Sequence, residues 1–339
     1  MSLFRYHEMS FTMAKQQPDQ KQSDNVVHVA VAVIRGDDGR ILVAKRPDDK
    51  HLGGLWEFPG GKVELDEDLK EALNRELVEE LDITVSQFQP LIAIQHQYPE
   101  KTVLLDTWLV SGVNGTPKGN EGQAVQWVEP DDLTGLDFPP ANEPIVNAVL
   151  LPRQYMVTGL FSSAAELIEK VSRQLENGLR LIQFRAPWLQ EKPYLHLARE
   201  LHHLCQPFNA KLLLKGNPEL LQETWCDGIH LRSDQLSIPV SEWKKYRREG
   251  QWLAASCHNE EQLKAAEKAG MDFVTLSPVR PTKSHPGRLS MGQEKATELT
   301  RCSTVPVYWL GGLGRSDEAL AIDCGAQGVA GIGAFWSIN

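Results

Sequence analysis

The stretch GGKVELDEDLKEALNRELVEELDI, residues 60–83, crowds carboxylate side chains onto one predicted helix. Glu76, Glu79 and Glu80 stand at i, i+3 and i+4 spacing, so a helix places all three on one face. Like charges at these spacings destabilise a helix by roughly 0.2–0.5 kcal/mol per pair. A divalent cation bound to the carboxylates would make the arrangement favourable, because hard cations take oxygen ligands. The pattern therefore favours a metal site on this helix.

The bulk properties of the chain limit its class. A length of 339 residues predicts two domains, and a formal net charge of −10 argues against a chain-wide nucleic-acid or membrane surface. No run of 18 apolar residues predicts a membrane helix. Residues 1–25 have the polar composition of a disordered tail, and the five cysteines lack the CxxC spacing of a zinc site. We expect a cytoplasmic protein that binds neither membrane nor nucleic acid directly.

Residues 26–150 have the pattern of an α+β domain. Residues 26–34 and 40–46 are typical of two strands joined by the turn GDDG. A helix is expected over roughly 67–81, with Asp66 as its N-cap. The other predicted elements are strands over 89–99, 102–113 and 123–130 and a helix over about 143–150. Together these elements predict a mixed sheet between helices.

Residues 151–339 change to a regular alternation of short apolar runs and helix-like segments. The eight runs are YMVTGLF, LRLIQFRA, AKLLLKG, DGIHL, WLAASCH, DFVTLSPV, VPVYWLGGL and GVAGIGAF. Eight strands that alternate with helices predict a (β/α)8 barrel of the TIM type.

The acidic stretch resembles the Nudix box. Gly61 is followed after five residues by Glu67, and after seven more by RELVEELDI at 75–83. One position departs from the family pattern, because Asp82 stands where the family usually has the glycine that ends the helix in a left-handed turn. Asp tolerates that turn better than most residues, so we expect the departure to leave activity intact.

The resemblance implies a role for each member of the box. The carboxylates of Glu76, Glu79 and Glu80 and the carbonyl of Gly60 would bind magnesium, and the same oxygen ligands would accept manganese. Arg75 would be structural and would pair with Glu67, which holds the helix against the loop.

The segments LWEFPGGK, NEGQAVQWV and DFPPANEP extend the resemblance to MutT, the Nudix branch that hydrolyses oxidised guanine nucleoside triphosphates. It implies that Glu121 is a further carboxylate near the metal and a candidate base, and that Asn142 recognises the purine edge. Phe58 would support the base pocket and Arg46 would meet phosphate. Each has a plainer alternative: Phe58 as core, Arg46 as a surface charge, and Asn142 as the cap of the last helix.

The second half resembles thiamine phosphate synthase and its TenI-like relatives. The motifs are GIHLRSDQL, AASCHNEEQLKAAEKAGMDFVTLSPVRPTKSHPG and GGLG…GAQGVAGIGAFW. The resemblance implies a small molecule bearing phosphate, bound by backbone amides at Gly311, Gly312, Gly331 and Gly333. The alternative is that these glycines serve only tight barrel turns.

This half also departs from the synthase pattern. Ala186 and Pro187 stand where the synthase has a lysine shortly after its QxR motif. Lys215-Gly216 replaces the Asn-Asp pair whose acid is a metal ligand, although Asp234 remains at the second acidic position. We therefore expect no complete thiamine phosphate synthase activity.

Three histidines could lie at the barrel mouth. They are His230, His258 and His285. The spacing of His230 and His258 matches the family's own, so structural histidines with satisfied hydrogen bonds are the favoured interpretation.

The sequence thus predicts a metal-dependent pyrophosphohydrolase. It would cleave 8-oxo-dGTP, and dGTP, to the nucleoside monophosphate and pyrophosphate, which cleanses the nucleotide pool and prevents mutation. Two alternatives stay open: hydrolysis of a thiamine-pathway diphosphate that the barrel then binds, and a nucleotide-binding sensor or scaffold without catalysis. The intact acidic set speaks against the last, and DFPPANEP favours a nucleotide over a thiamine-pathway substrate.

Overall fold

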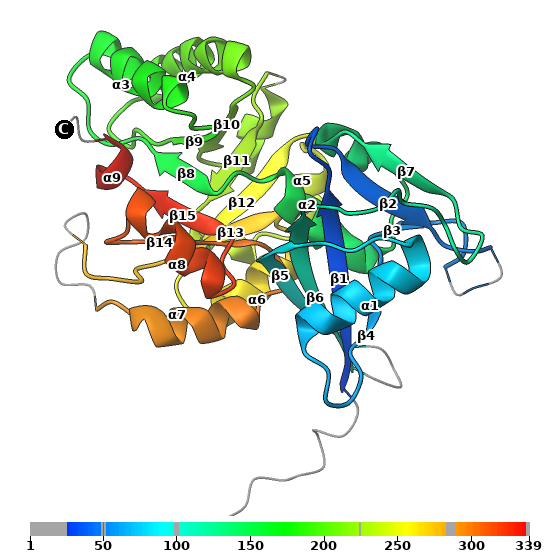
Figure 1. Ribbon diagram of the computed structural model, residues 1–339. Coiled ribbons are helices and arrows are strands. Elements are labelled where there is room, and N and C mark those ends of the chain that lie inside the picture. Colours follow the sequence, from blue (N-terminus) through cyan, green and yellow to red (C-terminus); the bar gives the residue numbers. More distant parts are fainter. Residues whose placement is uncertain are drawn as a thin grey trace, which may run out of the picture.

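The computed structural model describes residues 26–48, 50, 52–97, 102–223, 225–282 and 289–336. The expected disordered tail over 1–25, and His285, lie outside the described residues. Figure 1 shows two domains side by side, a sheet domain from the N-terminal part and a barrel from the C-terminal part. None of the helices in these ranges is long and apolar enough to cross a membrane.

The first domain is built on one sheet. Its strands are β1 (Val26–Arg35), β2 (Ile41–Lys45), β3 (Trp56–Glu57), β4 (Gly60–Lys62), β5 (Gln87–Gln97), β6 (Thr102–Ser111) and β7 (Val125–Val128). The order is β3-β2-β1-β6-β5, with β4 paired to β1 and β7 paired to β2. Only β1 and β6 pair in parallel among these strands, so the predicted mixed sheet is confirmed.

Helices cover both faces of this sheet. Successive side chains of a strand point to opposite faces, so Ala30, Ala32 and Ile34 pack with α1 (Leu69–Leu81). Val31 and Val33 pack on the other side with α2 (Glu143–Leu150). The central strand β1 is therefore apolar on both faces. The 3₁₀ helices η1 (Pro130–Gly135) and η2 (Pro140–Asn142) lead into α2.

The ends of α1 follow local chemistry. The predicted N-cap Asp66 is wrong by two residues: Asp66 has a φ of 67° in the preceding turn, and Asp68 caps the helix. The Asp68 carboxylate accepts from Lys70 N and Glu71 N, and Glu71 completes a capping box. At the other end Asp82 has a φ of 58°, so it adopts the left-handed turn that we expected of it.

The second domain is a closed barrel of eight parallel strands, as predicted. They are β8 (Gln154–Val157), β9 (Leu181–Phe184), β10 (Lys211–Lys215), β11 (Gly228–Leu231), β12 (Trp252–Cys257), β13 (Phe273–Leu276), β14 (Val307–Leu310) and β15 (Gly328–Gly331). The helices are α3 (Ala164–Glu176), α4 (Glu191–Cys205), α5 (Val240–Lys244), α6 (Glu260–Lys268), α7 (Gly292–Arg301), α8 (Glu318–Asp323) and α9 (Gly333–Trp336). Four 3₁₀ helices complete the connections: η3 (Gln206–Phe208), η4 (Pro218–Gln222), η5 (Ser233–Ser237) and η6 (Arg315–Asp317).

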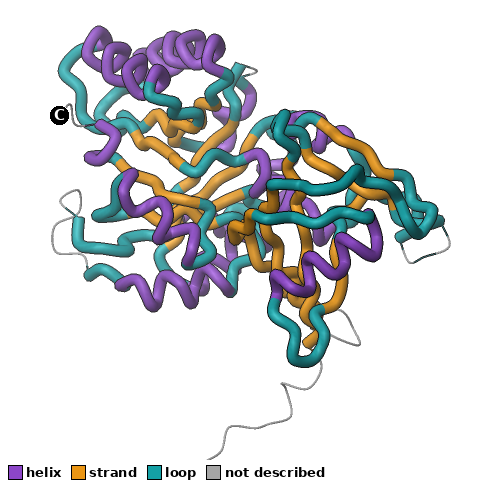
Figure 2. Tube along the Cα trace, in the orientation of Figure 1, coloured by secondary structure: helices purple, strands orange, loops and turns teal. Residues whose placement is uncertain are grey.

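The barrel has two apolar layers because strand side chains alternate. Tyr155, Phe273 and Tyr308 point inward and fill the interior with ring contacts at 5.5 Å. Phe184 and Leu212 point outward into the layer beneath the helices. Figure 2 shows the strands at the centre of this domain with helices around them. The barrel is thus a packed core, and space for a ligand remains only at its ends.

The first domain contacts the end of the barrel where the strands begin. Gln327, just before β15, donates from Nε2 to the carbonyls of Ala148 and Leu151 at 3.0 and 2.8 Å. Arg153, just before β8, donates to Gln89 of β5 at 3.3 Å. The carboxyl ends of the strands therefore open on the side away from this interface.

Candidate functional site

Helix α1 presses two of its glutamates against β4. The Glu76 carboxylate fills the space beside Gly61, where an added Cβ would lie 2.1 Å from it, so a side chain at residue 61 would displace this carboxylate. Glu80 Oε2 accepts from Gly60 N at 3.4 Å. The glycine pair thus lets both carboxylates approach the backbone of the sheet.

Other carboxylates share this place. Burial and, to a lesser extent, the negative charges of Glu57, Glu76 and Glu121 together raise the pKa of Glu80 to about 7. Burial also raises the pKa of Glu57, against the opposing charges of Arg46 and Lys50. We call Glu57, Glu76, Glu80 and Glu121 the acidic cluster. Its members come from β3, from α1 and from the loop before β7.

Arg75 ties the cluster to its support. Its Nε and Nη2 donate to the two oxygens of Glu67 at 2.8 and 2.9 Å, and Nη1 donates to Glu76 at 2.8 Å. Nη2 also donates to the carbonyl of Lys62 at 2.9 Å. These bonds raise the pKa of Arg75 and lower that of Glu67. The guanidinium therefore holds helix, loop and β4 together, which is the pairing that the resemblance implied.

The remaining members of the set lie at the rim. Glu79 has 61% of its side chain exposed, and its carboxylate lies 3.6 Å from Arg75. Glu121 accepts from Lys50 Nζ at 3.0 Å. Arg46 forms an ion pair with Glu57, so it borders the acidic cluster. The structure thus brings Glu79 less far into the site than its position in the box suggests.

The segment DFPPANEP lies beside β3. Trp56 N donates to the carbonyl of Asp137 at 2.8 Å, and Phe58 stacks on Phe138 with ring centroids 5.2 Å apart. Phe58 is 4% exposed, which places it in the core, as its plainer alternative states. Asn142 stands at the N-cap position of α2 but makes no side-chain cap hydrogen bond.

Two residues of this site escaped the sequence analysis. They are Glu57, which contributes a buried carboxylate, and Phe138, which stacks on Phe58. Both lie inside the quoted segments LWEFPGGK and DFPPANEP, and Glu57 stands three residues before Gly60. A search of those segments for further polar and aromatic side chains would have found them.

The carboxyl ends of the barrel strands surround a cavity of about 650 Å³. All four predicted glycines line it. Gly311 and Gly312 have φ of 102° and 65°, so their backbone itself demands glycine, as the tight-turn alternative holds. Gly333 differs, because a Cβ there would meet nothing within 4 Å. The fold therefore does not explain Gly333, and a close-approaching ligand remains a reason for it.

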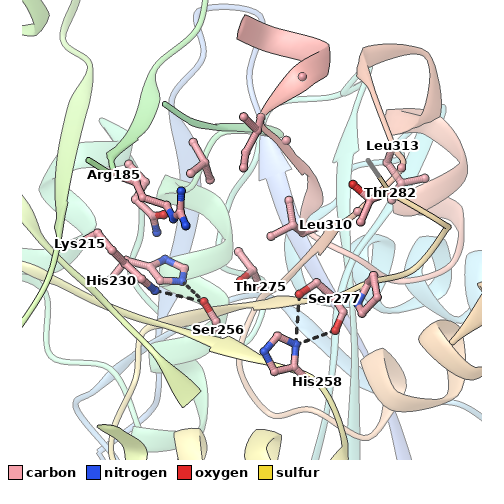
Figure 3. A pocket seen from close by; sticks show the side chains of 18 of the residues that line it. Arg185, Lys215, His230, Ser256, His258, Thr275, Ser277, Thr282, Leu310 and Leu313 are labelled. Atoms are coloured by element: carbon pink, nitrogen blue, oxygen red, sulfur yellow. Dashed lines mark hydrogen bonds between the residues drawn. The ribbon is translucent and has the colours of Figure 1, made fainter. Parts of the chain in front are cut away.

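A buried hydrogen-bonded chain forms one wall of this cavity. His230 Nδ1 lies 2.9 Å from Tyr155 Oη, and its Nε2 lies 3.0 Å from Ser256 Oγ. Lys215 Nζ donates to Ser256 Oγ at 3.3 Å and to the carbonyl of Leu231 at 2.8 Å. Figure 3 shows Lys215 and His230 both reaching the Ser256 hydroxyl.

Burial lowers the pKa of His230 well below its usual value, so this histidine is neutral. It has partners on both ring nitrogens, as the structural interpretation requires. His258 also lines the cavity, and its Nδ1 lies 2.7 Å from the carbonyl of Ser277. A carbonyl only accepts, so that nitrogen carries a proton.

Comparisons with known proteins divide the chain in the same way. The model of the NUDIX domain family matches residues 30–148, and that of the thiamine monophosphate synthase family matches residues 154–335, more than half of the chain. The 8-oxo-dGTP diphosphatase of Escherichia coli is 38% identical over 35% of this chain and 93% of its own. A candidate thiamine-phosphate synthase of Aquifex aeolicus is 32% identical over 55% of this chain and 98% of its own.

The chain belongs to both families. Its first domain is a Nudix hydrolase domain, and its second is a thiamine monophosphate synthase domain. The CTP pyrophosphohydrolase of Escherichia coli is 37% identical to the Nudix domain, over 38% of this chain and 94% of its own. Relatives that act on different nucleotides are thus about equally similar, which supports pyrophosphohydrolase activity on nucleotides as a class.

The Nudix domain has the donor chemistry of a site for a hard divalent cation. Carboxylate oxygens are the ligands that magnesium prefers, and a cation would relieve the repulsion that raises the pKa of Glu80. Across the described part of the chain, no three acidic, histidine or cysteine side chains already converge as a ligand group. Arg75 and Lys50 occupy the Glu76 and Glu121 carboxylates instead. The carboxylates are of the chemical type that the ion binds, and the ion pairs with Arg75 and Lys50 have to break before the ion can bind.

The synthase-family barrel does not fit a metal. Asp234 is held by Arg232 through two hydrogen bonds of 2.9 and 3.0 Å, and Lys215 points into the same cavity. With Arg185, three basic side chains line the cavity beside the single carboxylate of Asp234, within the residues that the structure describes. The cavity is therefore suited to an anionic ligand and not to a cation.

Proposed function

We propose that the Nudix domain hydrolyses purine nucleoside triphosphates, with 8-oxo-dGTP preferred over dGTP. The products would be the nucleoside monophosphate and pyrophosphate, and the effect would be to remove a mutagenic nucleotide. The acidic cluster supports this proposal, because the cation that a triphosphate needs would balance the negative charges that its carboxylates place around the half-buried Glu80. The 38% identity to an 8-oxo-dGTP diphosphatase supports the choice of base.

Each residue has a part in this scheme. Glu76 and Glu80, with the Gly60 carbonyl, would hold magnesium or manganese, and Glu79 and Glu121 would complete the ligands from the rim. The cation would supply positive charge to the triphosphate and to the attacking water. Arg75 and Glu67 keep α1 in place, as their hydrogen bonds indicate.

Substrate recognition would come from the segment beside β3. Asn142 offers an amide donor and acceptor together, which suits the edge of a purine, and its side chain is not used in capping α2. Phe58 supports that segment from the core through Phe138. Arg46, at the end of β2, would meet phosphate once its pairing with Glu57 opens.

The test is pyrophosphate release with 8-oxo-dGTP, dGTP, CTP and thiamine diphosphate at equal low concentration, with and without magnesium. We expect 8-oxo-dGTP to be hydrolysed fastest and only with the metal. A preference for CTP, the substrate in the name of one relative, would overturn the choice of base and keep the class of enzyme. A preference for thiamine diphosphate would overturn both in favour of a thiamine-pathway role.

Variants of α1 separate catalysis from folding. Glu76→Gln and Glu80→Gln remove a ligand charge and should each lower kcat by about 10²-fold or more. Glu71→Gln is the matched control on the same helix, because its side chain accepts from Asp68 N in the capping box and glutamine does the same. Full magnesium-dependent turnover in the Glu80→Gln protein would contradict the assignment of Glu80 as a metal ligand. Nucleotide binding without turnover in the wild-type protein would favour a sensor.

We also propose that the barrel does not complete the thiamine phosphate synthase reaction. Lys215-Gly216 stands in place of the Asn-Asp pair, so Gly216 replaces the acidic metal ligand, and Arg232 engages Asp234. The Nudix domain contacts the opposite end of the barrel through Gln327 and Arg153, so a product of the first site has no enclosed path to the cavity. This arrangement disfavours a thiamine-pathway diphosphate passed from one domain to the other.

A further inference from the structure

Lys215 ends β10 inside the barrel mouth and has an unusual set of partners. Its ammonium group donates to the carbonyl of Leu231 and the hydroxyl of Ser256, both of which are neutral. In the ranges that the structure describes, no carboxylate forms an ion pair with its Nζ. The nearby acid Asp234 is already engaged by Arg232. A buried ammonium without a counter-ion is unfavourable, so this site favours the neutral amine.

The charged groups around Lys215 also favour the neutral form of its amine. Burial and, to a lesser extent, the positive charges of Arg185 and Arg232 together lower the pKa of Lys215 to about 7, against the opposing charge of Asp234. His230, which shares the Ser256 hydroxyl with Lys215, is neutral, and burial raises the pKa of Tyr155, so this tyrosine stays uncharged as well. A large fraction of Lys215 is therefore an uncharged nucleophile near pH 7, whereas an ordinary lysine is almost wholly protonated there.

We propose that Lys215 forms a Schiff base with an aldehyde or ketone that carries an anionic group, and that the barrel cavity is the site of this chemistry. The lone pair of Nζ attacks the carbonyl carbon, and the carbonyl oxygen takes up a proton, which gives a carbinolamine. The hydroxyl then leaves as water while the C=N bond forms. One water is released for each adduct, and nothing is oxidised or reduced.

The surrounding residues suit this step. Ser256 contacts both Lys215 and the neutral His230, so its hydroxyl can pass the proton lost by the amine toward the departing oxygen. Arg185 and Arg232 line the same cavity and would hold the anionic group of the substrate. A volume of about 650 Å³ admits a small phosphorylated carbonyl compound.

The test traps the adduct on the full chain. Pyridoxal 5′-phosphate serves as the phosphorylated aldehyde, cyanoborohydride reduces the imine, and peptide mass spectrometry measures the rate of modification at each lysine. Lys211 is the matched control, because it begins the same strand, is exposed, and lies 3.9 Å from Asp227. At pH 7 we expect Lys215 to be modified roughly 10–100-fold faster than Lys211, since far more of it is neutral.

The pH profile and two variants make the result decisive. Modification of Lys215 should rise with a midpoint near pH 7. Arg185→Met should slow the reaction with pyridoxal 5′-phosphate more than the reaction with unphosphorylated pyridoxal, because it removes a partner of the phosphate in addition to a charge that lowers the pKa of Lys215. Lys215→Arg keeps the positive charge and should abolish the adduct. Equal rates at Lys215 and Lys211, or a Lys215 midpoint near pH 10, would overturn the proposal on the wild-type protein alone.

Discussion

Gln327 of the barrel donates a hydrogen bond of 3.0 Å to the carbonyl of Ala148 in the Nudix helix α2. Residue 152, which would normally donate to that carbonyl, is proline and has no N–H. The barrel thus caps a helix of its neighbour. Because this contact lies where the barrel strands begin, it joins the domains while leaving the cavity of Lys215 open at the far end.

The first prediction concerns this contact. Gln327→Met keeps the length of the side chain but removes the donor to Ala148 and Leu151. Because Gln327 is buried, two carbonyls lose their partner, and the unfolding free energy should fall by about 1–3 kcal/mol. Denaturant unfolding measures the change. The exposed Gln190→Met is the control and should stay within about 0.5 kcal/mol of wild type; an equal effect of both would refute the capping role.

The second prediction concerns the support of the metal site. Glu67→Gln weakens the clamp on Arg75 without removing a predicted ligand. Loss of such a support typically costs about 10–100-fold in metal affinity. The magnesium concentration for half-maximal turnover should rise by that factor, with a smaller change in kcat at saturating metal. Glu64→Gln, on the same loop and exposed, should change neither quantity. An unaltered magnesium dependence in Glu67→Gln would show that Arg75 keeps the metal ligands in place without its ion pair to Glu67.

The third prediction is a pH dependence of stability. The pKa of Lys215 is about 7 in the folded protein, below its ordinary value, so between pH 7 and 10 the unfolded chain binds more protons at this residue. The cost of burying the charge is fully present below pH 7 and is relieved as the pH rises. Lys215→Met removes that cost. The unfolding free energy of Lys215→Met should therefore exceed that of the wild type at pH 6.5, and this excess should shrink by about 2 kcal/mol between pH 6.5 and 9.

Denaturant unfolding of both proteins across this range measures the third prediction. The difference between them cancels the titration of other groups, including the buried Cys226, whose pKa is raised to about 11. A gain that does not vary with pH would mean that Lys215 stays charged in the folded protein, which would also weaken the case for its nucleophilic role.

The fourth prediction is a missing activity. Purified protein given the pyrimidine pyrophosphate and the thiazole phosphate should form no thiamine phosphate above a protein-free blank. The reason is that Lys215 and the paired Asp234 leave no acidic pair for a metal. An authentic thiamine phosphate synthase run in parallel shows that the assay works. Product formation by this chain would overturn our interpretation of the departures at residues 186, 187, 215 and 216.

Features that depend on neighbouring residues were predictable. The spacing of Glu76, Glu79 and Glu80 indicated one helix face, and the alternation of apolar runs indicated the barrel. The left-handed turn at Asp82 followed from the position of a family glycine. The N-cap was placed two residues early because Asp66 and Asp68 are both acceptable caps, and only the backbone turn at Asp66 selects between them.

The amino-acid pattern was enough to predict the mixed sheet and the barrel, because strands and helices follow local periodicity, and the resemblance of short motifs was enough to indicate the two families and the residues of the Nudix box. Only the tertiary structure decided which distant groups meet. Strand pairing brings Glu57 to the carboxylates of α1, and barrel closure brings Lys215 to Ser256, 41 positions away in the chain. The pKa of Glu80 and of Lys215 depends on that burial and on those neighbours, and a one-dimensional pattern records neither.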